Sequence, residues 1–143
     1  MINEICSFTI PGSIKTLMEK HAQKVYPGEC CGIMLGRKKE NGISEIVKIY
    51  EAENLERQIT GTDSNDVSKI SFEIDPLTIY KAEKQSMESG LEIIGFYHSH
   101  PDKEAILSEK DKKRMLPDML YAVLSVTYNG CRDIRIWRVD KNY

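Results

Sequence analysis

Apolar residues recur every three to four positions in two stretches of the chain, which is the spacing of one buried helix face. These stretches predict helices over 13–26 and 76–89, and a short charged stretch over 108–115 predicts a third helix. We expect Ser13 to cap the first helix, and Asp75, which precedes a proline, to cap the second.

Other apolar runs are short and lie between turn residues, and this pattern predicts strands. The predicted strands cover residues 30–36, 43–54, 71–75, 91–100, 121–128 and 131–140. Two Asn-Gly pairs, at 41–42 and 129–130, indicate tight hairpin turns. Together these elements predict one α/β or α+β domain, 1–143, whose mixed, largely antiparallel sheet is flanked by helices. The polar, aperiodic residues 55–70 are expected to form a long exposed loop.

The composition is ordinary for a globular protein, with 41% hydrophobic and 29% charged residues and a net charge of -2. This balance predicts neither a nucleic-acid partner nor an anionic membrane partner. No apolar run approaches the roughly 18 residues that span a bilayer. Residues 1–13 lack the pattern of a signal peptide, so we expect a cytoplasmic protein.

The four cysteines include an adjacent pair, Cys30 and Cys31, and form no CxxC motif. A disulfide framework is not expected in a reducing compartment. Because the pair begins an apolar segment, we predict that both thiols are buried as small hydrophobic groups. Reactive or metal-binding thiols are the alternative.

The most informative segment is His98-Ser99-His100-Pro101. Residues i and i+2 of a strand point to the same side, so the two histidines are expected to project together from the end of a buried strand. Ten residues separate His100 from Asp111, which is enough for a loop to bring Asp111 back. Two imidazoles, one carboxylate and one water complete a tetrahedral zinc site with an open position. Nitrogen and oxygen ligands favour zinc but leave manganese and iron open.

An HxH pair alone is weak evidence for a metal, because histidine pairs also occur on polar surfaces. Ser108 and Asp111 fit a capping box at the start of a helix, a role that is compatible with metal ligation. Amidohydrolase-like sites need a barrel of about 200 residues or more. Cupin-like sites need a later histidine, and the chain has three histidines and none after His100. The remaining one, His21, falls on the first predicted helix, where we expect a packed or solvent-facing side chain.

The H-S-H-P sequence, followed after six residues by S-x-x-D, resembles the signature of the JAMM metalloproteases, also called the MPN-plus family. The family motif adds an upstream glutamate, and Glu29 in YPGECCGIMLG matches it. Asn54, the segment FEIDP (72–76) and the segment GLEIIGFYHSHPD (90–102) extend the resemblance to short bacterial and archaeal members along nearly the whole chain.

The resemblance implies a JAMM/MPN (cytidine-deaminase-like) fold with a curved mixed sheet. It also implies one zinc ion bound by His98, His100 and Asp111. Glu29 would then act as the general base that activates the attacking water, and Ser108 would help to stabilise the oxyanion. Glu29 is indicated by the resemblance alone, because a glutamate before a strand is usually a solvated residue.

Members of this family hydrolyse peptide or isopeptide bonds after the C-terminal Gly-Gly of ubiquitin or ubiquitin-like proteins. Short prokaryotic members resemble enzymes that trim ubiquitin-like sulfur-carrier proteins or release cysteine built on the carrier. The resemblance therefore implies a zinc-dependent peptidase of this type, with a sulfur carrier or its conjugate as substrate.

Three other functions stay open: a deubiquitinase-like isopeptidase, a non-catalytic MPN-type scaffold that binds no zinc, and a thiol-transfer protein that uses Cys30 and Cys31. Residues 55–70 either contact the ubiquitin-like part of the substrate or form a variable surface loop. Exposed strand edges also make a homodimer compatible with the predicted sheet.

Overall fold

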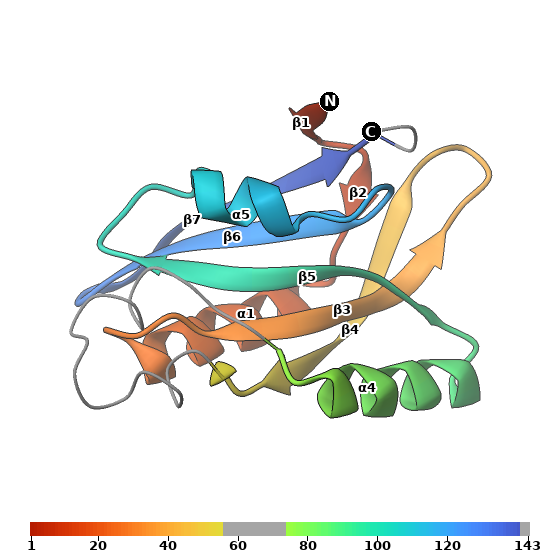
Figure 1. The fold of residues 1–143 in the computed structure, drawn as a ribbon, viewed down its shortest axis with the longest axis horizontal. Helices are drawn as coiled ribbons and strands as arrows, with labels where there is room; N and C mark the ends of the chain where they lie inside the picture. The colour runs from red at the N-terminus through yellow and green to blue at the C-terminus, as the bar shows by residue number, and fades with distance from the viewer. Residues whose placement is uncertain (56–73, 141–143) are drawn as a thin grey trace.

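The computed structural model describes residues 1–55 and 74–140, which form a seven-stranded sheet and three helices (Figure 1). The strands are β1 (Ile2–Glu4), β2 (Phe8–Thr9), β3 (Cys31–Lys38), β4 (Ser44–Ala52), β5 (Glu92–Pro101), β6 (Leu120–Thr127) and β7 (Gly130–Val139). The helices are α1 (Gly12–Val25), α4 (Pro76–Glu88) and α5 (Glu109–Arg114). The α+β class expected from the sequence is confirmed.

The sheet has the strand order β1-β7-β6-β5-β3-β4-β2. Neighbouring strands are antiparallel except for two parallel pairs, β5 with β6 and β2 with β4. A parallel pair needs a crossover, and the chain between β5 and β6 contains α5. Both predicted hairpins are present, β3–β4 and β6–β7, and their turns use Gly42 and Gly130 at φ +86° and +119°. The sheet is therefore mixed and largely antiparallel, as predicted.

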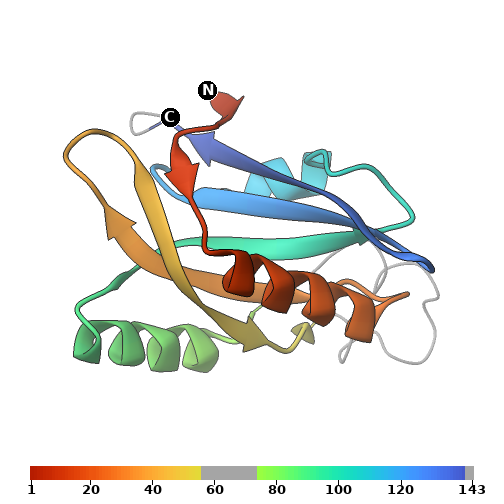
Figure 2. The same cartoon turned by 180° about the vertical axis from the view of Figure 1, so that it is seen from behind.

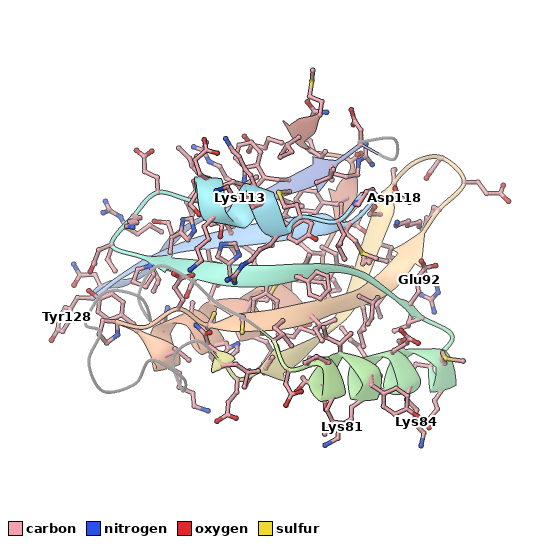
Figure 3. All side chains as sticks on the ribbon, in the orientation of Figure 1. Lys81, Lys84, Glu92, Lys113, Asp118 and Tyr128 are labelled. Carbon is pink, nitrogen blue, oxygen red and sulfur yellow. The ribbon has the colours of Figure 1, made fainter. Side chains whose placement is uncertain are left out.

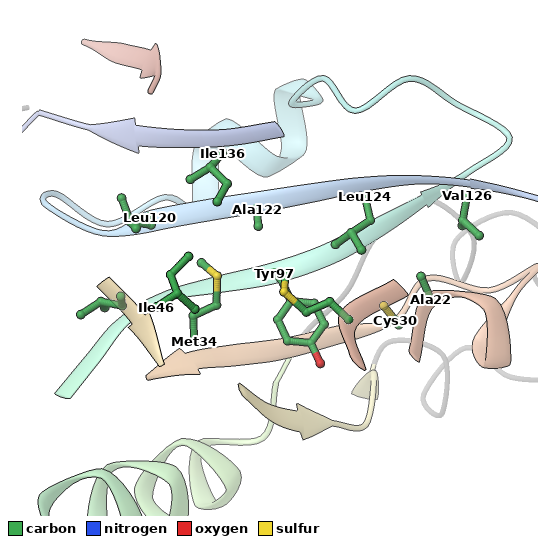
Figure 4. Close-up of a cluster of buried hydrophobic side chains, with 12 residues drawn as sticks. Ala22, Cys30, Met34, Ile46, Tyr97, Leu120, Ala122, Leu124, Val126 and Ile136 are labelled. Atoms are coloured by element: carbon green, nitrogen blue, oxygen red, sulfur yellow. The ribbon is translucent and has the colours of Figure 1, made fainter. Parts of the chain in front are cut away.

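One face of the sheet is covered by α1, which lies in front of the strands when the molecule is viewed from behind (Figure 2). Alternate residues of β6 point to this face and pack with residues of α1, β3 and β5 into the largest core cluster (Figure 4). Its buried members are Met18, Ala22, Cys30, Met34, Ile46, Ile94, Tyr97, Leu120, Ala122, Leu124, Val126 and Ile136. This cluster joins α1 to five strands of the sheet.

The opposite face carries α5, which lies in front of β6 in Figure 1, and α4, which packs on β3. Ile33 and Leu35 of β3 pack against Ala82 of α4. Tyr121 and Val123 of β6 pack with the segments on either side of α5. Within the described residues, no helix is both long enough and apolar enough to cross a membrane.

The sequence pattern does not predict β1 and β2, which lie at opposite edges of the sheet. β1 pairs with β7 over three residues, and β2 pairs with β4 over two. Strands this short carry no readable alternation of apolar and polar residues. They form because the long edge strands β7 and β4 offer unpaired backbone groups.

The predicted cap of the first helix is wrong. Ser13 is the second residue of α1, and Pro11 occupies the N-cap without a side-chain hydrogen bond. The amides of Ile14 and Lys15 donate to the Pro11 carbonyl instead, each at 3.0 Å. The cap of α4 is as predicted, since Asp75 accepts a hydrogen bond from the Leu77 amide at 2.9 Å.

The strand predicted over 71–75 is not present in its described part. Asp75 is the N-cap of α4, and residue 74 is not in a strand. Residues 71–73, and residues 56–70 of the expected loop, lie outside the described residues. The hypothesis that this loop contacts the substrate remains a prediction.

The packing of Gly32 generates a stability prediction. Gly32 lies opposite Tyr97 in the β3–β5 pair, and a Cβ atom at Gly32 would overlap ring atoms of Tyr97, which is fully buried. We expect Gly32→Ala to lower the free energy of unfolding by about 1–3 kcal/mol, as overpacked cores do. Urea denaturation measures this change. The matched control is Gly12→Ala, where a Cβ would meet no atom within 4 Å; equal stability of the two variants would contradict the prediction.

Candidate metal centre

Strand β5 lies in the middle of the sheet, between β3 and β6, and carries two histidines near its end. His98 and His100 lie on the face that carries α5, which Lys113 marks in Figure 3. Both side chains are buried, and their Nε2 atoms are 3.1 Å apart. The pairing expected from the i, i+2 spacing is therefore present in the fold.

Asp111 reaches the histidines from the first turn of α5. Ser108 is the N-cap of this helix, and its Oγ accepts a hydrogen bond from the Asp111 amide at 3.0 Å. Asp111 Oδ2 in turn accepts from the Ser108 amide at 2.9 Å, which completes the predicted capping box. The box holds the Asp111 carboxylate in one orientation, toward the end of β5.

Three potential ligand atoms converge at this point. Asp111 Oδ2 lies 3.0 Å from His100 Nε2 and 3.1 Å from His98 Nε2. Ligand atoms about 2.0 Å from a tetrahedral zinc ion would be about 3.3 Å from each other, so the observed triangle matches one shared ion. All three atoms belong to residue types that ligate zinc, and the set fits the metal that the sequence predicts.

The hydrogen bond of His100 Nδ1 supports the same interpretation. Nδ1 lies 3.1 Å from the Glu104 carbonyl oxygen, which can only accept, so Nδ1 carries the hydrogen. In the neutral ring, Nε2 then presents a lone pair toward the carboxylate of Asp111. Two lone pairs facing each other in a buried site repel, and a cation between them removes this repulsion.

The protonation states at this centre are set by burial and by the contacts just described. Burial disfavours the charged imidazolium and lowers the pKa of His98, although Asp111 opposes this shift. Burial alone would raise the pKa of Asp111, but its close contacts with His100 and His98 and the hydrogen bond from the Ser108 amide outweigh burial and hold the pKa below its usual range. A neutral imidazole beside an ionised carboxylate is the form in which both groups bind metals.

Glu29 lies beside the histidines, although it is far from them in sequence. It comes two residues before β3, is 1% exposed, and one of its oxygens lies within 4.8 Å of a nitrogen of each histidine. Glu29, His100 and Ser108 line a common cavity of about 490 Å³. The fold therefore brings together all five residues of the predicted site.

The remaining histidine belongs to the core. His21 is 6% exposed, its Nδ1 lies 2.8 Å from the Tyr97 hydroxyl, and the two rings meet edge to face. Burial lowers its pKa, which opposes a charge there. Of the two positions expected from the sequence, packed or solvent-facing, His21 therefore takes the packed one.

The adjacent cysteines are buried, as predicted. Cys30 and Cys31 are 1% and 0% exposed, and both are free thiols. Burial raises the pKa of Cys30 to about 12 and raises that of Cys31 as well. Because the thiolate is the reactive form, neither thiol has the properties of a nucleophile.

Two contacts of the site had no signal in the sequence. The acceptor for His100 Nδ1 is a backbone carbonyl, at Glu104, so no residue type marks it. The loop after β5 is anchored by the buried Ser125, whose hydroxyl donates to the Lys103 carbonyl. A serine on a buried strand gives no indication of this partner, because the pairing depends on the tertiary fold.

Two curated proteins are similar in sequence to this chain. One is a desampylase of Haloferax volcanii, which is 23% identical over 69% of this chain and 63% of its own length. The other is a desampylase of Pyrococcus furiosus, which is 31% identical over 61% of this chain and 51% of its own length. The chain thus spans about half to two thirds of the length of these relatives.

Two solved structures share the fold. A Salinibacter ruber protein has a TM-score of 0.66 at 24% identity and covers 96% of this chain and 84% of its own. A Desulfitobacterium hafniense protein has a TM-score of 0.68 at 24% identity, with coverages of 87% and 88%. In addition, residues 12–140 match the family of prokaryotic homologues of the JAB domain, in agreement with the JAMM resemblance of the sequence motif. Since this match spans nearly the whole chain, the protein belongs to that family.

Proposed function

We propose that this chain is a zinc-dependent peptidase that cleaves the peptide bond after the C-terminal Gly-Gly of a ubiquitin-like sulfur-carrier protein. The observation that carries the proposal is the convergence of His98, His100 and Asp111 within 3.0–3.1 Å, next to a buried glutamate and a cavity. A buried set of this kind has the composition of a catalytic zinc site with an open position.

His98, His100 and Asp111 would hold one zinc ion per chain. When bound, zinc supplies Lewis-acid chemistry, lowering the pKa of a coordinated water toward 7 and polarising a peptide carbonyl. The Glu104 carbonyl keeps the His100 ring in the tautomer that leaves Nε2 for the metal, and the capping box orients Asp111.

Glu29 would act as the general base. Its carboxylate accepts a proton from the attacking water and then donates that proton to the amine nitrogen that leaves. Its position beside the histidines and along the cavity wall is consistent with both transfers. Burial of the side chain excludes bulk water, which would otherwise compete for the proton.

Ser108 would stabilise the oxyanion that forms as water attacks the carbonyl. A hydroxyl has one donor hydrogen and two acceptor lone pairs, and the helix cap uses only an acceptor lone pair. The hydroxyl can therefore cap α5 and still donate toward the cavity that Ser108 lines.

The motif and the relatives support the proposed substrate class. Both curated relatives are named desampylases, which agrees with a JAB-family hydrolase that acts on ubiquitin-like modifiers. The cavity is also lined by Lys103, Glu104, Ile106 and Lys110, a mixed surface suited to a polypeptide. Removal of a modifier from a lysine side chain, an isopeptidase activity, is the alternative reaction of the same site.

The metal assignment predicts that the purified protein binds one zinc ion per chain. We expect His98→Ala and Asp111→Ala to reduce the bound zinc to less than about a tenth, because each removes a ligand from a three-ligand site. Elemental analysis after dialysis measures the content. The control is His21→Asn, a change of a buried histidine outside the centre, which should keep its zinc. If the parent protein contains no stoichiometric zinc, the result would contradict the proposal and favour the scaffold alternative.

The role of Glu29 predicts that Glu29→Gln keeps its zinc but loses activity. Removal of a general base lowers kcat by about 10² to 10⁴-fold. The assay uses a ubiquitin-like sulfur carrier extended beyond Gly-Gly, with the products identified by intact mass and a chelator as a second control. Activity of Glu29→Gln equal to that of the parent would rule out this role. Cleavage of isopeptide-linked conjugates alone would favour the alternative reaction.

The thiol-transfer alternative predicts reactive cysteines, and the burial of Cys30 and Cys31 predicts the opposite. We expect iodoacetamide to modify the exposed Cys6 in the folded protein and to leave Cys30 and Cys31 intact until denaturant is added. Peptide mass mapping distinguishes the sites. Rapid modification of Cys30 or Cys31 in the folded state would revive the thiol mechanism.

A further inference from the structure

The peptide unit that follows Glu29 is held at both of its polar ends by side chains. Its carbonyl oxygen, on Glu29, accepts a hydrogen bond from Asn54 Nδ2 at 3.2 Å. Its N–H, on Cys30, donates to Ser99 Oγ at 2.8 Å. Asn54 and Ser99 are 7% and 0% exposed, so water does not compete for these bonds. The orientation of this peptide plane, and with it the direction of the Glu29 side chain, is thereby restrained.

The turn before Glu29 is held by a different pair. The Tyr26 hydroxyl donates to both carboxylate oxygens of Asp102, at 2.8 and 2.9 Å. The hydrogen bond to Asp102 also raises the pKa of Tyr26, so the hydroxyl keeps its proton and remains a donor. Asp102 has φ +57°, a conformation that aspartate tolerates better than most residues, and its amide donates to the Val126 carbonyl at 2.7 Å.

Two of these partners come from the strand end that carries the histidines. Ser99 stands between His98 and His100, and Asp102 follows His100 by two residues. The backbone adds a further link, because the Ser99 amide donates to the Cys30 carbonyl at 3.1 Å. A shift of the Glu29 turn relative to the histidines would therefore break the buried bonds between Cys30 and Ser99 and the more exposed Tyr26–Asp102 bonds at once.

We propose that Tyr26, Asp102, Ser99 and Asn54 are positioning residues that set the distance between the Glu29 carboxylate and the metal centre. The proposal rests on the proposed role of Glu29 as general base. None of the four touches the reacting atoms. They act by holding the segment 26–30 against the end of β5, and a displacement of about 1 Å in such a group can cost about 10²-fold in rate.

The first experiment removes single hydrogen-bonding groups from the Tyr26–Asp102 pair. We expect Tyr26→Phe and Asp102→Ala to lower kcat by about 10-fold or more, with KM within about twofold and zinc content unchanged. Asp102→Asn keeps an acceptor oxygen for the tyrosine and should retain more of kcat than Asp102→Ala. The matched control is Tyr128→Phe, a nearby tyrosine that is 88% exposed. Unchanged kcat in Tyr26→Phe, or a loss that merely follows loss of zinc or of folded protein, would overturn the proposal.

The second experiment needs no activity. In Ser99→Ala the Cys30 amide loses its acceptor, so its hydrogen exchange should become at least about 10-fold faster, while amides in the middle of β6 stay protected. Unchanged exchange at Cys30 would overturn the positioning contact itself. If the parent protein cleaves no extended carrier, the proposed function is wrong. The exchange rate of the Cys30 amide then still tests whether Ser99 restrains the peptide unit after Glu29.

Discussion

The antiparallel pairing of β3 with β5 is the constraint on which the candidate metal centre depends. Because the strands run in opposite directions, the start of β3 meets the end of β5, and Cys31 lies opposite His98. Glu29, just before β3, is thereby brought to the histidines across a gap of about 70 residues in sequence. A shift of this register by one residue would turn the histidines to the α1 face, away from Asp111.

The two faces of the sheet differ in what they bury. The α1 face is apolar and continuous from β4 to β7, and the polar groups of His21 and Tyr97 satisfy each other within it. The α5 face buries three groups, His98, His100 and Asp111, whose mutual repulsion is relieved by a proton or a cation. Burial of these three groups lowers the stability of the fold. The surrounding core offsets this cost, and the capping box on Ser108 holds Asp111 in place.

The similarity of the fold to solved structures and the proposed chemistry rest on different observations. The solved structures share the backbone arrangement at 24% identity, and this similarity concerns the fold alone. The proposed chemistry rests on the side chains at the end of β5 and the start of α5 and on the nearby cavity. The same backbone with other residues at these positions would lack the three converging ligand atoms.

The sequence by itself determined the main elements, both hairpins, the capping box and the pairing of His98 with His100, because these depend on local periodicity and on neighbours a few residues apart. Only the tertiary structure decided the rest. It decided the pairing of β1 with β7 and of β2 with β4, and it placed the Glu104 carbonyl next to His100. It also decided the contacts of Ser99 and Asn54 with the Glu29 peptide unit. These contacts join residues that are distant in sequence or act through backbone atoms. Residue type does not encode such partners, since they form only when the sheet register brings them within hydrogen-bond distance.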